Sequence, residues 1–443
     1  MANKTGNTGP DDSPVSHPAA VIASSDASDQ GEKIYRKGTH RSRAPFETLA
    51  LVTPHLAAMG ITRVANVTGL DRVGLPVVAV YRPNARSVVV AQGKGLDLAA
   101  AKISGLMEAI ESDHAERPDL PLHLASEADL RQQGRAVADT TRLPRLSVSR
   151  YDPFRPILWC EAEDLMADGA ALAVPFEMVH TNFTRPLPTG SGNFQMSSNG
   201  LASGNHPFEA ICHGLCEVIE RDALALWSLR GGSHNPQGRL DLDSVDDPTA
   251  RDLIARLHNA GLTVGVWDIT TDVGVAAFLC LTADRETGAF GPAYISQGSG
   301  CHPAREVALS RALTEAAQTR LTYIAGTRDD ANREFFESAR NSERVAALRT
   351  RLDAIEASPR RSYGAVAHYE ARLFEDDLNW ILKGLTSAGL SQVAVVRFPS
   401  RIDGIFVVRV IVPGLEGLCE APGYVRGERA LAAVHPNREH MAS

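Results

Sequence analysis

Two short stretches of the sequence repeat an acidic pattern at the spacing of a helix. GLMEAIE, residues 105–111, returns as GLCEVIE, residues 214–220, with five of the seven letters unchanged. The two glutamates of each copy are three residues apart, so a helix places them on one face. An acidic helical face is commonly solvated, but carboxylates in this arrangement also bind divalent cations. The repetition favours a cation site.

The first copy places its acids beside the core. On a helix, Ser104, Glu108 and Glu111 share a face at i, i+4 and i+7. The apolar stripe of the same helix lies about a third of a turn away, so the two glutamates border it. We expect Gly105 and Ala109 to line the remaining side, where another backbone segment approaches closely.

The second copy starts at Asn205-His206-Pro207, a sequence typical of a helix N-terminus. Four polar residues fall in one narrow stripe of the helix that follows: Glu209, His213, Glu217 and Glu220. Three carboxylates on one face repel each other, and a bound cation would remove this penalty.

A more divergent third copy follows another His-Pro pair, His302-Pro303. Here Arg311, Glu315 and Gln318 repeat the i, i+4, i+7 spacing of the first copy. If the three helices converge, they form a cluster of oxygen ligands with an arginine beside it.

Carboxylate and amide oxygens favour magnesium over zinc or copper, and proteins usually share magnesium with substrate phosphates. The loop TGSGNFQMSSNGLASGN, residues 189–205, offers amides and backbone donors to a nucleotide, with Gln195 and Asn199 as the expected direct contacts. The sequence contains no Walker A pattern and no complete GxGxxG motif. A P-loop or Rossmann nucleotide site is therefore not expected.

Other residues with chemical potential have simpler interpretations. Cys212 and Cys216 flank His213 at i and i+4, but no second Cys/His pair stands at ligand spacing, so we interpret them as small buried residues. Lys94 lies in a GKG turn between a strand and a helix, where it either reaches a phosphate or serves only the turn. No histidine has a nucleophile partner in the sequence, and we assign none as a catalytic base.

The elements that must position these residues alternate along one folded body. Apolar runs predict strands over 63–70, 73–82, 86–95, 156–162, 263–268, 275–283, 292–297, 391–397 and 404–412. Periodic patterns predict helices over 45–59, 97–116, 207–229, 248–260, 303–325, 331–356 and 374–388. We expect a single large mixed α/β (α+β) domain over residues 33–420, a disordered N-terminal tail over 1–32 and a C-terminal tail over 421–443.

Composition excludes several classes of protein. A net charge of −8 argues against bulk attraction to nucleic acid or anionic lipid. No apolar run approaches the roughly 20 residues that cross a bilayer. Six cysteines in 443 residues do not form a disulfide framework, and the N-terminus makes a poor signal peptide. We expect a cytoplasmic protein that binds neither nucleic acid nor membrane.

Taken together, the motifs resemble the YcaO family over residues 33–420. They are KGTHR (37–41), VTGLDRVGLPV (67–77), QGKG (92–95), SGLMEAIE (104–111), SSNGLASGNHPFEAICHGLCEVIER (197–221), GSGCHPAREVALSRALTEAAQTR (298–320) and VPGLEG (412–417). The resemblance implies an ATP- and magnesium-binding fold without a P-loop. It also implies activation of peptide backbone amides, whose carbonyl oxygen is phosphorylated and leaves as phosphate.

The resemblance carries a set of site residues onto this chain. It implies metal ligation by Glu108, Glu111, Glu209, Glu217 and Glu220, and nucleotide contacts from Lys37, Ser104, Gln195 and Asn199. Arg221 and Arg311 are similar to the arginines that face or support the phosphates, while Glu315 and Gln318 are further candidates. Family members often have a serine where this chain has Ala44, so that contact is expected only if Ser42 replaces it. On this assignment, Glu220→Gln should abolish ATP turnover and leave the fold intact.

The end of the chain distinguishes between subfamilies. Azoline-forming cyclodehydratases often end in PxPxP, whereas this chain ends in VHPNREHMAS. The motifs look most like YcaO proteins that work beside a TfuA-type partner, which implies thioamide formation with delivered sulfide on a peptide or protein substrate. The alternatives are an azoline-forming cyclodehydratase that acts on Cys, Ser or Thr of a ribosomally made peptide, and a non-catalytic peptide-binding scaffold. The partner implied is a TfuA-type protein or another protein that delivers sulfur or binds a leader peptide. The resemblance also implies a homodimer.

Overall fold

A computed structural model describes residues 31–286, 293–354 and 360–434. Nearly all of the predicted N-terminal tail, residues 1–32, therefore lies outside the described residues. The described chain folds into helices packed on antiparallel sheets, which confirms the predicted mixed class.

Three sheets form the framework, and every strand in them pairs antiparallel with its neighbours. The first sheet contains β1 (Arg63–Asn66), β2 (Val77–Tyr81) and β3 (Val90–Lys94). The second contains β8 (Leu262–Asp268), β9 (Ala277–Asp284) and β10 (Ile295–Cys301). The third contains β4 (His123–Ala125), β5 (Ile157–Asp164), β6 (Ala170–Pro175), β7 (Leu201–Gly204), β11 (Ala394–Arg397) and β12 (Phe406–Ile411).

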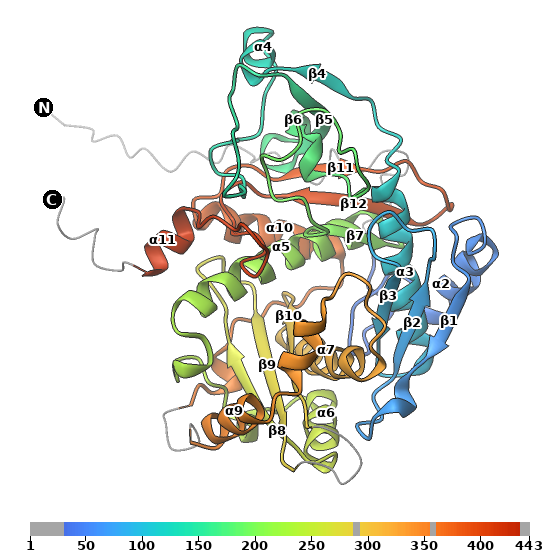
Figure 1. Ribbon diagram of the computed structural model, residues 1–443, viewed down its shortest axis with the longest axis vertical. Helices are drawn as coiled ribbons and strands as arrows, with labels where there is room; N and C mark the ends of the chain where they lie inside the picture. Colours follow the sequence, from blue (N-terminus) through green and yellow to red (C-terminus); the bar gives the residue numbers. More distant parts are fainter. Residues whose placement is uncertain (1–30, 287–292, 355–359, 435–443) are drawn as a thin grey trace, which may run out of the picture.

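Helices cover these sheets and fill the space between them (Figure 1). Three long helices lie inside: α3 (Leu98–Glu116), α5 (Pro207–Leu229) and α7 (Arg305–Ala325). The others are α2 (Pro45–Val52), α4 (Glu127–Gln132), α6 (Pro248–Asn259), α8 (Arg333–Ala339), α9 (Ser342–Ala354), α10 (Phe374–Ser387) and α11 (Glu428–Val434). Each inner helix packs on a different sheet: α3 on β2 and β3, α5 on β7 and β12, and α7 on β9 and β10.

Glycines bring each inner helix unusually close to its sheet. A Cβ on Gly93 of β3 would lie 2.1 Å from backbone atoms of α3, among them the nitrogen of Gly105. A Cβ on Gly298 of β10 would lie 2.1 Å from the backbone nitrogen of Ala316 on α7. Gly214 of α5 similarly approaches the backbone of Gly200. The close approach expected at Gly105 is therefore present, and related contacts occur on all three helices.

The start of each inner helix is fixed by local chemistry. Asp97 caps α3 by accepting a hydrogen bond from the backbone N–H of Ala100. His206 caps α5 through Nδ1, which accepts from the N–H of Phe208 at 3.2 Å, and proline takes the first helical position. His302 Nδ1 accepts from the N–H of Ala304 just before α7. Both His-Pro pairs lie at helix starts, but α5 begins at Pro207, whereas α7 begins at Arg305, two residues after Pro303 and later than the predicted start at 303.

The structure differs from the sequence prediction at several elements. Residues 201–204 form strand β7 inside the stretch predicted as a loop, because their backbone pairs with β12 despite three small residues. The second sheet continues to Cys301, beyond the strand predicted over 292–297, since glycines 298 and 300 face α7 instead of ending the strand. The helix predicted over 331–356 is two helices, α8 and α9. Elements β4, α4 and β6 were not predicted, and the predicted C-terminal tail contains α11.

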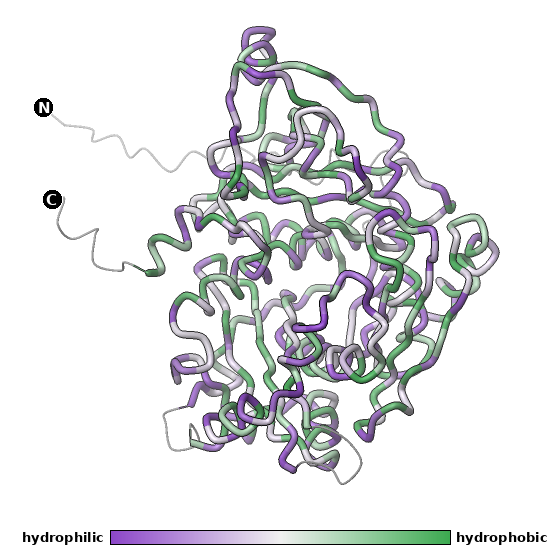
Figure 2. Tube along the Cα trace, viewed as in Figure 1, coloured by the Kyte–Doolittle hydropathy of each residue, from purple (hydrophilic) through white to green (hydrophobic). Residues whose placement is uncertain are grey.

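The distribution of hydropathy agrees with this layered arrangement. Figure 2 shows apolar segments along the inner strands and helices, while α4 at the top is hydrophilic. Within the described residues, no helix combines the length and apolar character that spanning a bilayer requires.

We predict that Gly93→Ala will strongly destabilise the protein. The added Cβ would overlap the α3 backbone, which cannot rotate away, so the helix must shift. The expected loss is about 3 kcal/mol or more in the free energy of unfolding, measured by urea denaturation. Gly69→Ala is the matched control, because its Cβ would meet nothing within 4 Å. Equal stability of the two variants would contradict the proposed close contact.

Candidate active site

A cavity of about 770 Å³ lies where α3, α5 and α7 meet. Its wall combines the three copies of the acidic pattern found in the sequence. The predicted site residues on this wall are Lys37, Ser104, Glu108, Glu111, Asn199, Glu209, Glu217, Arg221, Arg311, Glu315 and Gln318. The three helices thus present side chains from distant parts of the chain to one space.

Two predicted residues do not reach the cavity wall. The side chain of Gln195 is buried, and its amide donates to the carbonyl of Leu418 at 2.9 Å and accepts from the N–H of Leu418 at 2.8 Å. Gln195 therefore holds the C-terminal segment, in place of the predicted nucleotide contact. Glu220 is buried behind the wall, where it accepts a hydrogen bond from Ser299 Oγ at 2.7 Å.

The glutamates of α3 form no ion pair among the described residues, although Arg328 and Lys94 lower the pKa of Glu108 and Arg41 lowers that of Glu111. Burial raises the pKa of Glu108 to about 7, although the backbone N–H of Gln92 donates to it at 3.3 Å. Burial also raises the pKa of Glu111 to about 8, even though Ser203 Oγ donates to it at 2.5 Å. Two carboxylates that titrate this high are poorly neutralised by the protein alone.

The glutamates of α5 lie in different surroundings. Burial raises the pKa of Glu217 to about 7 against the opposing effect of Arg221. Glu209 accepts from the N–H and Oγ of Ser42, at 3.0 and 2.6 Å, and lies 3.6 Å from Arg41 Nη1. Ser42 therefore positions Glu209. Ala44 is the N-cap residue of α2, and its methyl side chain cannot form a hydrogen bond.

Glu315 of α7 is already neutralised within the protein. Lys94 Nζ lies 2.5 Å from its carboxylate, and the N–H of Ser299 donates to it at 3.2 Å. Burial would raise the pKa of Glu315, but Lys94 and Arg221 outweigh burial and bring it down to about 2. Gln318, one turn further on, donates to the carbonyl of Gln92 at 2.9 Å. These contacts join α7 to β3 and give Lys94 a defined partner.

The donor set fits a magnesium ion. Glu108, Glu111 and Glu217 supply hard oxygen ligands that lack a full counter-charge, and Asn199 Oδ1 is buried without a hydrogen-bond partner among the described residues. Divalent cations bound in the cavity together with phosphates would supply the missing positive charge. The arginines fit an anion, since the Nε atoms of Arg221 and Arg311 are also buried without a partner in the part of the chain that the structure describes.

Several wall residues were not assigned from the sequence. Arg41 and Ser203 contact the predicted glutamates, and Arg328 lines the cavity from the segment after α7. Asn205 accepts from Thr48 Oγ1 at 2.8 Å and approaches Glu209 through Nδ2 at 3.4 Å. Asn205 directly precedes the His-Pro pair that starts α5, and this position in the sequence could have identified it as a residue near the cavity. Arg41, Ser203 and Arg328 have no such local signal, because their place in the wall depends on contacts between distant segments.

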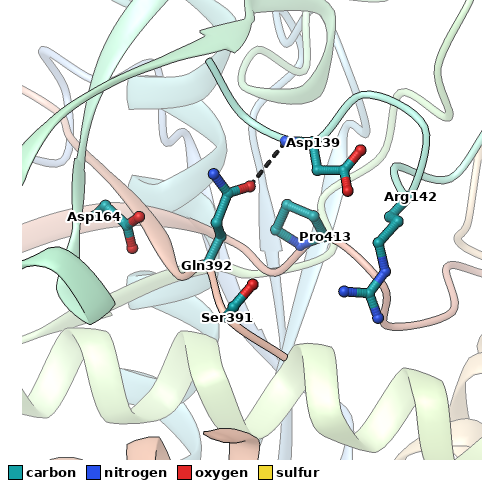
Figure 3. A pocket seen from close by; sticks show the side chains of 6 residues that line it. All are labelled: Asp139, Arg142, Asp164, Ser391, Gln392 and Pro413. Atoms are coloured by element: carbon teal, nitrogen blue, oxygen red, sulfur yellow. Dashed lines mark hydrogen bonds between the residues drawn. The ribbon is translucent and has the colours of Figure 1, made fainter. Parts of the chain in front are cut away.

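A second, smaller pocket of about 360 Å³ is lined by Asp139, Arg142, Asp164, Ser391, Gln392 and Pro413 (Figure 3). The polar side chains in this pocket form hydrogen bonds with nearby backbone groups. Asp164 accepts from the N–H groups of Met166 and Val393 at 3.0 and 3.1 Å, and Gln392 accepts from the N–H of Asp139 at 2.8 Å. None of the predicted site residues lies there.

Outside the main cavity, His40, His302 and Asp377 bring possible ligand atoms within 4.8 Å of one another. Two features oppose a metal ion there. Lys33 Nζ lies 2.6 Å from Asp377 and already supplies that carboxylate with a counter-charge. His302 Nδ1 accepts a backbone N–H, so its neutral ring carries the proton on Nε2. Cys212 and Cys216 are buried free thiols, as interpreted from the sequence.

We predict that Glu111→Gln will stabilise the ligand-free protein and that the gain will grow with pH. The folded pKa of about 8 exceeds the ordinary value of 4.5, so unfolding releases a proton between these values and stability falls as pH rises through them. The neutral amide removes this cost while keeping an acceptor for Ser203. Above pH 8 the gain in free energy of unfolding should be on the order of 2 kcal/mol.

Urea denaturation of the metal-free protein at pH 6 and pH 8.5 measures this difference. Glu337→Gln, on the outer helix α8, is the control: it removes a carboxylate from an exposed ion pair with Arg333, and its small effect should be the same at both pH values. An equal or smaller stability of Glu111→Gln at the higher pH would contradict the buried, uncompensated charge.

Known proteins resemble this chain over most of its length. A protein-family model described as YcaO cyclodehydratase, ATP- and Mg²⁺-binding, matches residues 92–416. A protein of Rhizobium leguminosarum bv. trifolii, named as an uncharacterised protein in the tfuA 3′ region, is 37% identical over 85% of this chain and 88% of its own length. An uncharacterised protein of Methanothermobacter thermautotrophicus is 36% identical over 88% of this chain and 98% of its own.

Solved structures share the fold at lower sequence identity. The structure of YcaO from Methanopyrus kandleri, bound with AMPPCP and Mg²⁺, matches with a TM-score of 0.69 and 22% identity, over 90% of this chain and 99% of that one. A heterocyclase in complex with substrate and cofactor matches with a TM-score of 0.68 and 21% identity, over 87% of this chain and 55% of that longer one.

Proposed function

The chain belongs to the YcaO family, and from this premise we propose that it uses ATP to phosphorylate the backbone amide oxygen of a peptide and so activates that amide. ATP and Mg²⁺ are the cofactors given for the family. One observation carries the proposal: three uncompensated glutamates and two arginines line the same cavity. This combination suits a metal-bound triphosphate.

Bound magnesium would neutralise phosphate charge. Glu108, Glu111 and Glu217 would hold it, supported by Glu209 from the same face of α5. Arg311 and Arg221 would face the phosphates and stabilise charge on the transferred group, while Lys37, Ser104 and Asn199 would contact the nucleotide. Little covalent chemistry is asked of the protein, so positioning and charge compensation account for catalysis.

The proposed reaction transfers the terminal phosphoryl group of ATP to the amide oxygen and releases ADP. A nucleophile then attacks the amide carbon, and the carbon–oxygen bond breaks as inorganic phosphate leaves. With sulfide as nucleophile the product is a thioamide. With a cysteine, serine or threonine side chain of the peptide it is an azoline.

We favour the thioamide product. A relative at 37% identity is named for its place in the tfuA 3′ region, which supports a TfuA-type partner that delivers sulfur. The family description and the heterocyclase neighbour support azoline formation as the second candidate. A non-catalytic scaffold would not need buried, uncompensated acids in its cavity. We also propose that the protein acts as a homodimer.

We predict that Glu217→Gln will lower magnesium-dependent ATP turnover by about 100-fold or more, because the variant loses a charged ligand at the cavity wall. Steady-state phosphate release measures the effect, and Glu337→Gln is again the surface control. Turnover within a factor of two of the wild type would remove Glu217 from the ligand set.

Glu220→Gln tests the assignment made from the sequence. Glu220 lies behind the cavity and accepts a hydrogen bond from Ser299 Oγ, a bond that a glutamine oxygen can keep. If Glu220 is a ligand, the variant loses ATP turnover as completely as Glu217→Gln. If it only positions Ser299 and Arg221, most turnover remains in the same assay.

The product separates the two chemistries. We expect the intact mass of a modified peptide to show exchange of one oxygen for sulfur, and only when a sulfide source is present. Loss of water from the peptide without any sulfur requirement would replace the thioamide proposal with azoline formation.

A further inference from the structure

Arg311 is held differently from the cavity cations Lys94 and Arg41, which pair with carboxylates. Lys94 is paired with Glu315 at 2.5 Å, and Arg41 lies 3.6 Å from Glu209. Among the described residues, Arg311 has no carboxylate within ion-pair distance. The hydrogen bond that holds its side chain runs from Nη2 to Nε2 of His213, at 3.2 Å.

The hydrogen bond from Arg311 determines which ring nitrogen of His213 carries the proton. A guanidinium group only donates, so Nε2 must accept and the neutral ring carries its proton on Nδ1. Nδ1 is buried near the backbone of Ser203. Burial, together with Arg311 and Arg41, also holds the pKa of His213 well below its ordinary value. The ring is therefore a neutral acceptor.

A neutral acceptor has a specific advantage at this position. His213 lies between Glu209 and Glu217 on the cavity face of α5, where a fourth acidic residue would fit the pattern. A carboxylate there would orient Arg311 but would also neutralise its charge. An imidazole orients the guanidinium and leaves its positive charge available to an anion in the cavity.

We infer that His213 is a positioning residue that holds Arg311 towards the phosphates of bound nucleotide without cancelling its charge. This role rests on the proposed function. The hydrogen bond from Arg311 to His213 also links α7 to α5, the helix that carries Glu209 and Glu217.

A double-mutant cycle tests the inference. His213→Leu removes the acceptor, Arg311→Ala removes the donor, and the pair is combined in one chain. Affinity for a non-hydrolysable ATP analogue with Mg²⁺, measured by calorimetry, and ATP turnover are compared across the four proteins. When Arg311 is present, we expect His213→Leu to lower the affinity, the turnover or both by about 10- to 100-fold. In the Arg311→Ala background, the same substitution should lower either quantity by less than about twofold.

Two further variants separate positioning from packing. His213→Gln keeps a neutral acceptor and should restore activity to within about fivefold of the wild type. His213→Glu should be as inactive as Arg311→Ala, because the new carboxylate pairs with the guanidinium. Thermal unfolding of each variant verifies that it is folded.

Equal losses from His213→Leu with and without Arg311 would overturn the inference, as would a folded His213→Gln as inactive as His213→Leu. Both results leave the proposed function standing, provided that the wild type binds and hydrolyses ATP. A wild type that does neither would overturn both proposals together.

Discussion

The gathering of like charges in a low-dielectric space is the constraint on which this structure depends. Glutamates from α3, α5 and α7 line one cavity, and burial raises the pKa of three of them to about 7 or 8. Such a cluster opposes folding unless cations compensate it. The protein compensates only part of the charge: Lys94 neutralises Glu315 and Arg41 lies 3.6 Å from Glu209, whereas Glu108, Glu111 and Glu217 have no ion pair among the described residues. Stability must therefore come from the packing of the helices on their sheets.

The sequence predicted the inner helices well because their signals are local. The start of α5 follows from His206-Pro207 and its end from the loss of periodicity, and both bounds agree with the prediction. The shared face of Glu108 and Glu111 follows from helical geometry alone. Strand β7 was missed because LASG has no strand-like pattern, and only its pairing with β12 makes it extended.

The candidate site was predictable only in part, for the same physical reason. Residues on a periodic helix face could be grouped, but the groups that complete the site come from segments far apart in the chain. Ser203 reaches Glu111 across 92 positions, and Lys94 reaches Glu315 across 221. Gln195 looked equivalent to Asn199 in one polar loop, yet its amide pairs with the backbone of Leu418. No local sequence pattern shows that Asn199 lines the cavity while Gln195 binds the backbone of Leu418.

The glycine contacts between helices and sheets have a mechanical consequence. Where Gly298 meets α7 and Gly93 meets α3, backbone rests directly on backbone, with no side-chain rotamers through which the contact could relax. The three helices thus form a stiff frame, and their spacing resists sliding or tilting. Differences in substrate preference among proteins built on this frame should accumulate in the segments around the cavity mouth, such as the one that carries Arg328, where the backbone can change without disturbing the acids.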